Sequence, residues 1–440
     1  MGYEESLGLA TLAKLISESL YKRAVKVIPG GVTRPLRYFA PYPFYAKKAH
    51  GSKLVDFEGR TYSDFWMGHG ALVLGHLHPA VVRAAKEQLK LGCHLGVCNE
   101  WEVKLAEQVT ELVPSVEMIA FNNSGNEANM HALMLARAYT KRVKVGKFEG
   151  AFHGVVESLH VGVGWPVGEP ESAGQDPLSA QNTILLPSDD PNATYEMIRK
   201  EQLACVIVEL VVGGATVAVE REFIKGLSEV CNETGTVLIA DEVITGFRLA
   251  PGGAQEAFGI TPNLTTFGKA IGGGEFPVGA VGGNAEIMTL MDNRKHQKRS
   301  ELVMRGGTYV GNPLVMRAGY EATKVYAKGK FYAQIDGLGE RLRKGLQKVV
   351  EETHANAYVS GYGSMAKLHL LKQQVEKHDL KSLVTNADSQ REQSYFRYLS
   401  SKGIFAMTPG QVHFYVSLPH RKEEIDRTIR TTEEFLKSSK

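Results

Sequence analysis

Amphipathic helical stretches alternate with short apolar runs between residues 80 and 241, and no other feature constrains the fold as strongly. Helical spacing is found over 80–91, 101–112, 126–141, 193–201 and 221–234, and the apolar runs lie at 118–121, 143–148, 204–210 and 236–241. Strands that alternate with helices form a parallel sheet covered by helices on both faces. The sequence therefore predicts an α/β fold whose large domain is built on a mainly parallel sheet.

The segments on either side of this region have different patterns. Residues 8–28 have the spacing of an amphipathic helix, and residues 44–66 alternate as in short antiparallel hairpins. Residues 315–352 have the pattern of long helices, and 357–419 again mixes strands with helices. We expect the first and last segments to pack together as one smaller α+β domain. The expected boundaries are an N-terminal segment at 1–75, a large domain at 76–315 and a C-terminal domain at 316–440.

Charge and composition exclude several classes of function. Lys and Arg number 51 against 48 Asp and Glu, a net charge of +3 without a basic block, which argues against nucleic-acid binding. No apolar run reaches the roughly 18–20 residues of a membrane span, and Glu4 and Glu5 stand where a secretory signal is basic. Cysteines are few, and Cys93, His94 and Cys98 have no second ligand pair nearby, so no metal site is expected. These features predict a soluble cytoplasmic protein.

Two polar motifs stand where a predicted strand ends. Open parallel sheets bind ligands outside the carboxyl ends of their strands. The turn Ser124-Gly125-Asn126 opens a helix, so its N–H groups and hydroxyl can hold an anion, although an ordinary N-cap has the same sequence. Asp241 closes the run 236–241, where a carboxylate can serve a cofactor, a helix cap or a salt bridge.

Two further motifs combine glycines with an amine or a hydroxyl. Lys269 has small and apolar neighbours that can desolvate it, which lowers the pKa of an amine and makes it a nucleophile, whereas most lysines are solvated surface charges. Gly306-Gly307-Thr308 is a tight turn that suits a phosphate or a structural loop. The four motifs together indicate pyridoxal phosphate. A lysine can form a Schiff base with it, a carboxylate can keep its pyridine nitrogen protonated, and a helix N-terminus can hold its phosphate.

At these motifs the chain resembles the class III pyridoxal-phosphate aminotransferases of fold type I over nearly its whole length. Within that family it is similar to glutamate-1-semialdehyde 2,1-aminomutases and related aminotransferases. The resemblance is carried by VIPGGVTRPLR (27–37), GHGALVLGHLHPAV (68–81), NNSGNEAN (122–129), KFEGAFHG (147–154), VIVEL (206–210), LIADEVITGFR (238–248), GKAIGGGEFPVGAVGG (268–283) and GGTYVGNPL (306–314).

The resemblance implies a role for each matching residue. Lys269 is the expected Schiff-base lysine and proton carrier, and Asp241 the expected partner of the pyridinium nitrogen. The other implied cofactor contacts are Ser124, Gly125 and Asn126 at the phosphate, Thr308 reaching it from the neighbouring subunit, Phe152 and Val243 on the ring faces, His153 beside Phe152, and Glu209 near the phenolic edge. Since Thr308 acts across a subunit interface, the resemblance implies an obligate homodimer.

Several positions depart from the family pattern. Asn126 stands in place of the usual Thr, Phe152 in place of Tyr, and Leu210 in place of Pro. Phe152 keeps an aromatic stack but lacks a hydroxyl, so we expect modestly altered cofactor electronics.

Two arginines compete for the substrate carboxylate. Arg37 occupies the position of the carboxylate-binding Arg of the aminomutases, and Arg34 lies near that of aromatic β-amino-acid aminotransferases. Either guanidinium suits a carboxylate, and a salt bridge at the surface or an interface is the structural alternative for each. Val412 lies near the place where an aminomutase would have an acidic residue.

The sequence therefore predicts an aminotransferase with pyridoxal 5′-phosphate. It would move an amino group between a carboxylate-bearing β-, ω- or unusual amino acid and a keto acid, in a ping-pong cycle through a Schiff base. Glutamate-1-semialdehyde 2,1-aminomutase, which transfers the group within one substrate, is the alternative. An amino-acid racemase or epimerase on the same scaffold and a non-catalytic homologue are further alternatives.

Overall fold

The computed structural model describes residues 16–406 and 412–438. The expected helix over 8–28 is described from residue 16, is helical through residue 24 and continues as a turn over 25–27. It ends earlier than its spacing predicts because the chain tightens there, as in the bond from Lys26 N–H to the Arg23 carbonyl at 3.2 Å. Two short 3-10 turns follow, η1 (Pro29–Gly31) and η2 (Pro35–Arg37).

A seven-stranded sheet forms the centre of the larger part of the molecule, in the order β4-β12-β11-β10-β7-β5-β6. The strands are β4 (Met118–Asn122), β5 (Val145–Phe148), β6 (Thr183–Leu186), β7 (Cys205–Val208), β10 (Val237–Glu242), β11 (Leu264–Gly268) and β12 (Gly279–Gly283). Within the described residues, β12 alone is antiparallel to its neighbours, so the sheet is mainly parallel, as predicted. The apolar runs do not include β6, which is four residues long, β11, whose sequence is LTTFG, or β12, whose sequence is GAVGG.

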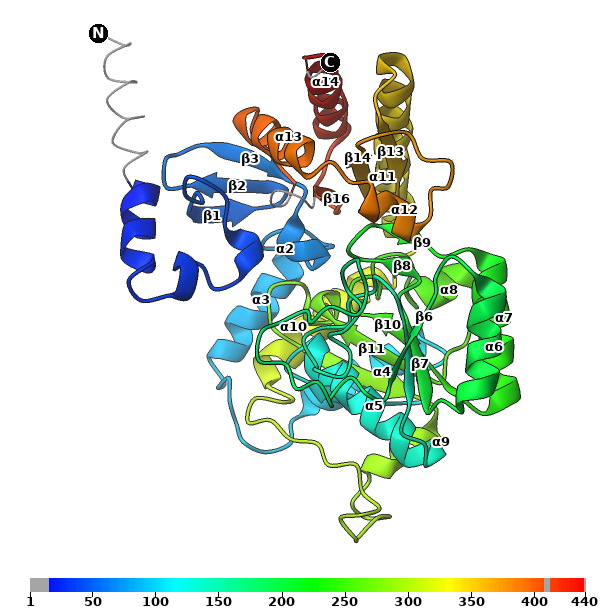
Figure 1. The fold of residues 1–440 in the computed structure, drawn as a ribbon. Helices are drawn as coiled ribbons and strands as arrows, with labels where there is room; N and C mark the ends of the chain where they lie inside the picture. Colours follow the sequence, from blue (N-terminus) through cyan, green and yellow to red (C-terminus); the bar gives the residue numbers. More distant parts are fainter. Residues whose placement is uncertain (1–15, 407–411, 439–440) are drawn as a thin grey trace.

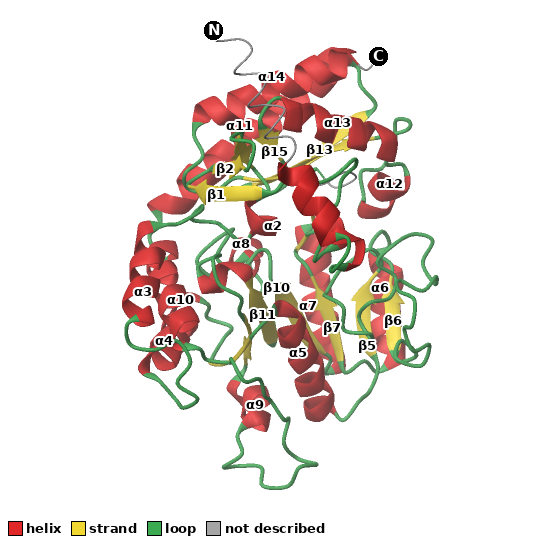
Figure 2. Cartoon of the chain, turned by 90° about the vertical axis from the view of Figure 1, so that its left-hand side faces the viewer, coloured by secondary structure: helices red, strands yellow, loops and turns green. Residues whose placement is uncertain are grey.

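Helices cover both faces of this sheet (Figures 1 and 2). Alternate side chains of β7 point to opposite faces, because Val206 and Val208 pack in the cluster that contains α7, whereas Ile207 packs in the cluster that contains α5. The helices of this part are α3 (Pro79–Leu89), α4 (Glu100–Leu112), α5 (Gly125–Thr140), α6 (Pro191–Glu201), α7 (Arg221–Thr234), α8 (Ala254–Phe258), α9 (Ala285–Met288) and α10 (Pro313–Tyr326), with the 3-10 turns η3 (Lys269–Gly272) and η4 (Thr289–Met291). The short α2 (Met67–Gly70) contacts β16 of the second group, which is described next.

A second group of elements stands above the carboxyl ends of the sheet strands (Figure 2). Its four-stranded sheet places β15 parallel to β3, so strands from both ends of the chain share one sheet. The strands are β1 (Ala46–His50), β2 (Lys53–Asp56), β3 (Thr61–Asp64) and β15 (Ile404–Phe405), then β13 (Ala357–Ser360), β14 (Met365–Leu370) and β16 (His413–Tyr415) in a three-stranded sheet. The pair β8 (Val211–Val212) and β9 (Val217–Ala218) is a separate two-stranded sheet in the segment that follows β7. The helices are α11 (Lys330–Thr353), α12 (Leu380–Thr385), α13 (Ser389–Ser401) and α14 (Lys422–Ser438).

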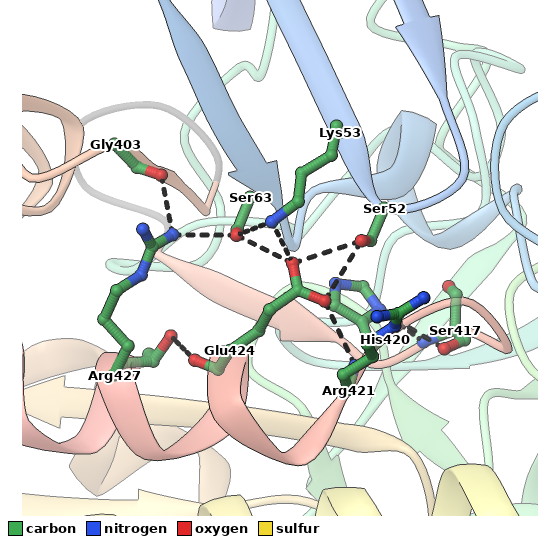
Figure 3. A network of polar contacts seen from close by, with 10 residues as sticks. Ser52, Lys53, Ser63, Gly403, Ser417, His420, Arg421, Glu424 and Arg427 are labelled. Carbon is green, nitrogen blue, oxygen red and sulfur yellow. Dashed lines mark hydrogen bonds and ion pairs between the residues drawn. The ribbon is translucent and has the colours of Figure 1, made fainter.

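Glu424 of α14 joins the C-terminal helix to the N-terminal hairpins (Figure 3). Its carboxylate accepts hydrogen bonds from Lys53 Nζ at 2.6 Å, from the Ser63 hydroxyl at 2.8 Å and from the Ser52 hydroxyl at 3.1 Å. Burial acts to raise the pKa of Glu424, but these donors and the nearby His420 outweigh it and hold the pKa below its ordinary value. Ionised Glu424 therefore links segments about 370 residues apart in the sequence.

In the part of the chain that the structure describes, no helix is both long enough and apolar enough to cross a bilayer.

Candidate active site

Three chain segments meet tightly at the carboxyl ends of β4, β10 and β11. A Cβ atom on Gly125, at the start of α5, would lie 2.7 Å from Cγ2 of Val243, and a Cβ atom on Gly268 would lie 3.1 Å from its Cγ1. A larger residue at position 125 would therefore push Val243 and the segment after β10 away from α5. Glycine at this position brings the helix start, the end of β10 and the residue before Lys269 into one place.

The N-terminus of α5 offers donors to an anion at this place. Ser124 is the N-cap, and its hydroxyl accepts a hydrogen bond from Glu127 N–H at 3.2 Å. The first N–H groups of a helix have no partner within the helix, and they lie at the positive end of its dipole. Asn126 uses its side-chain oxygen to accept a bond from Val155 N–H at 2.7 Å, which ties the segment 152–155 to the helix start.

Asp241 is buried at the end of β10 and accepts three hydrogen bonds. They come from His153 Nδ1 at 2.8 Å, from Asn129 Nδ2 at 3.0 Å and from Val243 N–H at 3.0 Å. Burial acts to raise the pKa of Asp241. The hydrogen bond from His153 and the charge of its ring, together with the hydrogen bonds from Val243 and Asn129, outweigh burial and hold the pKa below its ordinary value. Asp241 is therefore a fixed anion inside the protein.

Glu209 lies after β7, and its two oxygens hold two backbone segments. It accepts bonds from Phe152 N–H at 3.2 Å and from Gly213 N–H at 3.0 Å. Burial raises the pKa of Glu209, and the nearby Asp241 raises it further, while His153 and the two backbone donors act in the opposite direction. Phe152 itself keeps 41% of its surface exposed, although its neighbours Ala151 and His153 are buried. An aromatic ring is thus presented to open space beside two buried carboxyl groups.

Lys269 follows β11 with a left-handed backbone, at a φ of 49°. Burial lowers the pKa of Lys269 to about 8; Arg34 and Arg248 act in the same direction, and Asp241 and Glu209 oppose them. The amine forms no hydrogen bond or ion pair within residues 16–406 and 412–438. Lys269 is therefore an amine that is partly unprotonated near neutral pH and free to react.

The two candidate arginines differ in their surroundings. Arg34 is half-buried and donates from Nη1 to Nδ1 of His69 at 3.0 Å, and it acts electrostatically on Lys269. Arg37 is exposed and donates to the Thr33 hydroxyl at 2.8 Å. The structure therefore brings Arg34 toward the lysine and leaves Arg37 at the surface of this chain.

Thr308 is exposed, and its side chain forms no hydrogen bond with another residue that the structure describes. The preceding Gly307 does approach them, since a Cβ atom on it would lie 2.9 Å from the side-chain nitrogen of Asn123. Val412 is fully buried in the main hydrophobic cluster and presents no polar group.

Sequence reasoning missed several residues of the site. Asn129 lies one turn beyond Ser124-Gly125-Asn126 on α5, where helical spacing could have indicated it. His69 lies within a motif that is already part of the resemblance, but its contact with Arg34 depends on the tertiary fold. Arg248 closes the motif at 238–248 that is part of the resemblance, but its bond to the Gly70 carbonyl depends on the tertiary fold. No local pattern points to Tyr415, whose ring packs against Gly70.

The geometry can be compared with known proteins. The family model described as aminotransferase class-III matches residues 38–436. The chain belongs to this family. A curated class III relative, a glutamate-1-semialdehyde 2,1-aminomutase of Methanosphaera stadtmanae, is 38% identical over 95% of this chain and 97% of its own length.

Solved structures of other aminotransferases are similar over almost the whole chain. An omega-transaminase from Sphaerobacter thermophilus has a TM-score of 0.88 and 34% identity, and covers 96% of this chain and 97% of its own. A beta-phenylalanine aminotransferase from Variovorax paradoxus has a TM-score of 0.86 and 30% identity, and covers 99% of this chain and 97% of its own. The α/β fold type I architecture is confirmed, and the protein is an enzyme that depends on pyridoxal phosphate, as class III aminotransferases are.

The residues of this class III enzyme fit the cofactor. Three buried polar atoms beside the site have no partner among the described residues: Nε2 of His153, Oδ1 of Asn129 and Oγ1 of Thr266. Buried polar groups normally find partners, so these three atoms are available to a polar ligand or to water. An anion-binding helix start, a fixed carboxylate, an exposed ring and a free amine supply the complementary groups.

Proposed function

We propose that this enzyme transfers an amino group from a carboxylate-bearing β-, ω- or unusual amino acid to a keto acid, in a ping-pong cycle. The observation that carries the proposal is the position of Arg34. Its guanidinium is half-buried, acts electrostatically on Lys269 and pairs with no Asp or Glu among the described residues. A desolvated guanidinium without an anionic partner is suited to a carboxylate on the substrate.

Each polar residue of the site has a distinct task in this proposal. When bound, pyridoxal phosphate supplies an aldehyde carbon that takes up the amino group and a ring that withdraws electrons. Lys269 would hold the cofactor through Nζ and would move a proton to and from the substrate carbon that bears nitrogen. Asp241 would keep the pyridine nitrogen protonated, and His153 orients Asp241.

The remaining cofactor contacts are those that the resemblance to class III aminotransferases implies. Ser124, Gly125 and Asn126 would hold the phosphate at the start of α5, and Thr308 of a second subunit would complete that site. Phe152 and Val243 would pack against the ring. Glu209, whose pKa is raised by burial, would lie near its phenolic edge.

We also propose that the enzyme is a homodimer. Large apolar side chains are exposed at the end of α3 and in the loop after it, in the segment around Thr308, and on α5. The rings of His94 and Tyr309 lie 4.9 Å apart, so the first two of these regions are in contact. The exposed apolar residues are Leu89, Leu91, Leu95, Val97, Met130, Met134, Met304 and Tyr309. Clusters of this kind mark interfaces, and Thr308 needs a partner copy to reach a phosphate. Sedimentation of a species of twice the chain mass is the expected result.

We propose the division of the chain into a large domain at 76–315 and a small domain made from 1–75 and 316–440. The pairing of β15 with β3 and the bonds of Glu424 support it for the described residues.

We propose a cytoplasmic location for the enzyme. The four cysteines are all free in the structure, in keeping with a reducing compartment. Fractionation of the native host should recover the enzyme with cytoplasmic markers.

A second candidate is glutamate-1-semialdehyde 2,1-aminomutase. The relative from Methanosphaera stadtmanae, 38% identical to this chain, carries that name. Against this candidate, the place of the expected acidic residue is occupied by the buried Val412.

One experiment separates the two candidates. The holoenzyme is given a panel of amino donors with pyruvate or 2-oxoglutarate, and glutamate 1-semialdehyde without any acceptor. An intermolecular aminotransferase stops after one turnover when the keto acid is left out. Sustained conversion of the semialdehyde without an acceptor would establish the aminomutase instead.

A further inference from the structure

His69 lies in a run of four residues that all have left-handed backbone conformations. The φ angles are 47° for Met67, 60° for Gly68, 65° for His69 and 72° for Gly70. A residue other than glycine rarely adopts a positive φ, and such conformations persist where the surrounding structure holds them, often at functional sites. His69 is therefore held in place by its neighbours.

Those neighbours can be identified. The His69 ring lies 4.3 Å from the ring of Trp66. The buried Arg248 donates from Nη2 to the carbonyl of Gly70 at 2.8 Å. Tyr415 packs on the other side, since a Cβ atom on Gly70 would lie 3.0 Å from its ring. The backbone and the ring of His69 are thus both fixed before any ligand binds.

The contact between His69 and Arg34 has a defined direction. A guanidinium can only donate, so Nδ1 of His69 accepts the bond from Arg34 at 3.0 Å, and the ring proton is on Nε2. Burial lowers the pKa of His69 well below its ordinary value, with Lys269 and Arg34 contributing. The ring remains neutral and keeps its acceptor toward Arg34.

We infer that His69 is a positioning residue, which fixes the Arg34 guanidinium to receive the substrate carboxylate and so selects amines that carry one. The inference rests on the proposed function, because it assigns the carboxylate to Arg34. The Arg34 guanidinium forms one hydrogen bond within the described residues, the one to His69, so its other N–H groups are left for a ligand. Without His69, the Arg34 side chain would keep its charge but would be mobile. Part of the free energy of binding the substrate carboxylate would then be spent on ordering that side chain.

The test compares two amines that differ only in the carboxylate: 3-amino-3-phenylpropanoate and 1-phenylethylamine. Holoenzyme is mixed with each amine at several concentrations, and the change in cofactor absorption gives the rate constant of the half-reaction. This rate constant is divided by the amine concentration that gives half of the maximal rate. The ratio of the two values is the selectivity for the carboxylate. Thermal unfolding and the absorption of bound cofactor show that each variant is folded and loaded.

Three substitutions at position 69 separate positioning from packing. His69→Gly adopts a positive φ without strain but removes the acceptor, and we expect the selectivity to fall about tenfold or more, as for a lost hydrogen bond to a charged group. His69→Asn also tolerates this backbone and places an oxygen near the position of Nδ1, so it should restore most of the selectivity. His69→Asp has the same shape but pairs with Arg34 as an anion, so it should lower the selectivity as His69→Gly does.

Equal selectivity for His69→Asn and His69→Asp, or an unchanged selectivity for His69→Gly, overturns the inference and leaves the proposed function standing. A further loss when His69→Gly is added to Arg34→Ala also overturns it, because His69 would then act independently of Arg34. Wild-type enzyme that reacts with 1-phenylethylamine but shows no preference for the carboxylate refutes the proposed substrate class, and the inference with it.

Discussion

The lowered pKa of Lys269 makes a quantitative prediction for the attachment of the cofactor. Burial lowers this pKa from 10.5 to about 8. At pH 7 about one amine in ten is then neutral, against about one in three thousand for an unperturbed lysine, a gain of roughly 300-fold in reactive amine. The pKa is lowered, so the neutral nucleophile is scarce below pH 8 and predominates above it.

The assay measures how fast apoenzyme attaches pyridoxal phosphate between pH 6 and 10, by stopped-flow absorption. The rate constant should rise about tenfold per pH unit below pH 8 and level off above it, as a single ionisation requires. Pyridoxamine phosphate, which has no aldehyde, serves as the control for non-covalent binding at each pH. Arg34→Ala should move the midpoint upward, since Arg34 lowers the pKa, and Asp241→Asn should move it downward. A rate that is independent of pH, or that still rises steeply above pH 9.5, would refute the burial argument.

Three further predictions concern single residues. Asp241→Asn should lower kcat by about 10²–10⁴-fold. The substitution removes the anion and can place the NH₂ group of asparagine opposite two of the donors that Asp241 accepts from, and each charged hydrogen bond contributes about 1.5–3 kcal/mol. A smaller loss in single-turnover kinetics would contradict the role of Asp241. Arg34→Ala should raise KM for amino acid donors at least tenfold, with the loss of a charged contact, whereas Arg37→Ala should leave KM nearly unchanged; the reverse order would assign the carboxylate to Arg37. Glu424→Gln should lower the free energy of unfolding by about 1–3 kcal/mol, since Lys53 loses its ionic partner. Because the pKa of Glu424 is lowered in the folded state, this contribution is present above the ordinary pKa of a glutamate and is lost as the pH falls, which urea unfolding at several pH values can measure.

Much of the architecture could be predicted from local sequence. The runs that became β4, β5, β7 and β10 are apolar and lie between helices with clear periodicity, so the parallel sheet follows from the pattern. β12 could not be predicted in this way, because GAVGG has the composition of a loop and becomes a strand only by pairing between β11 and β4. Its small residues are needed there because a Cβ atom on Gly279 would clash with the Ser124 backbone.

The residues of the candidate site could also be predicted only in part from local sequence. Asp241 could be placed because it closes the apolar run that forms β10, and Lys269 because it lies among small and apolar neighbours beside a run of glycines. The choice between Arg34 and Arg37 could not be made from the sequence, because three residues apart they are equally suited to a carboxylate. Burial and the bond to His69 distinguish them, and both depend on residues brought together from distant segments.

The central claim is that Lys269 is the residue that binds the cofactor covalently and carries out amino transfer. The most direct measurement is borohydride reduction of the loaded enzyme followed by peptide mass spectrometry, on wild type and on Lys269→Ala. In the wild type we expect a phosphopyridoxyl group on the peptide that contains Lys269. In Lys269→Ala we expect neither that label nor sustained amino transfer. A label on another lysine, or full activity in Lys269→Ala, would contradict it.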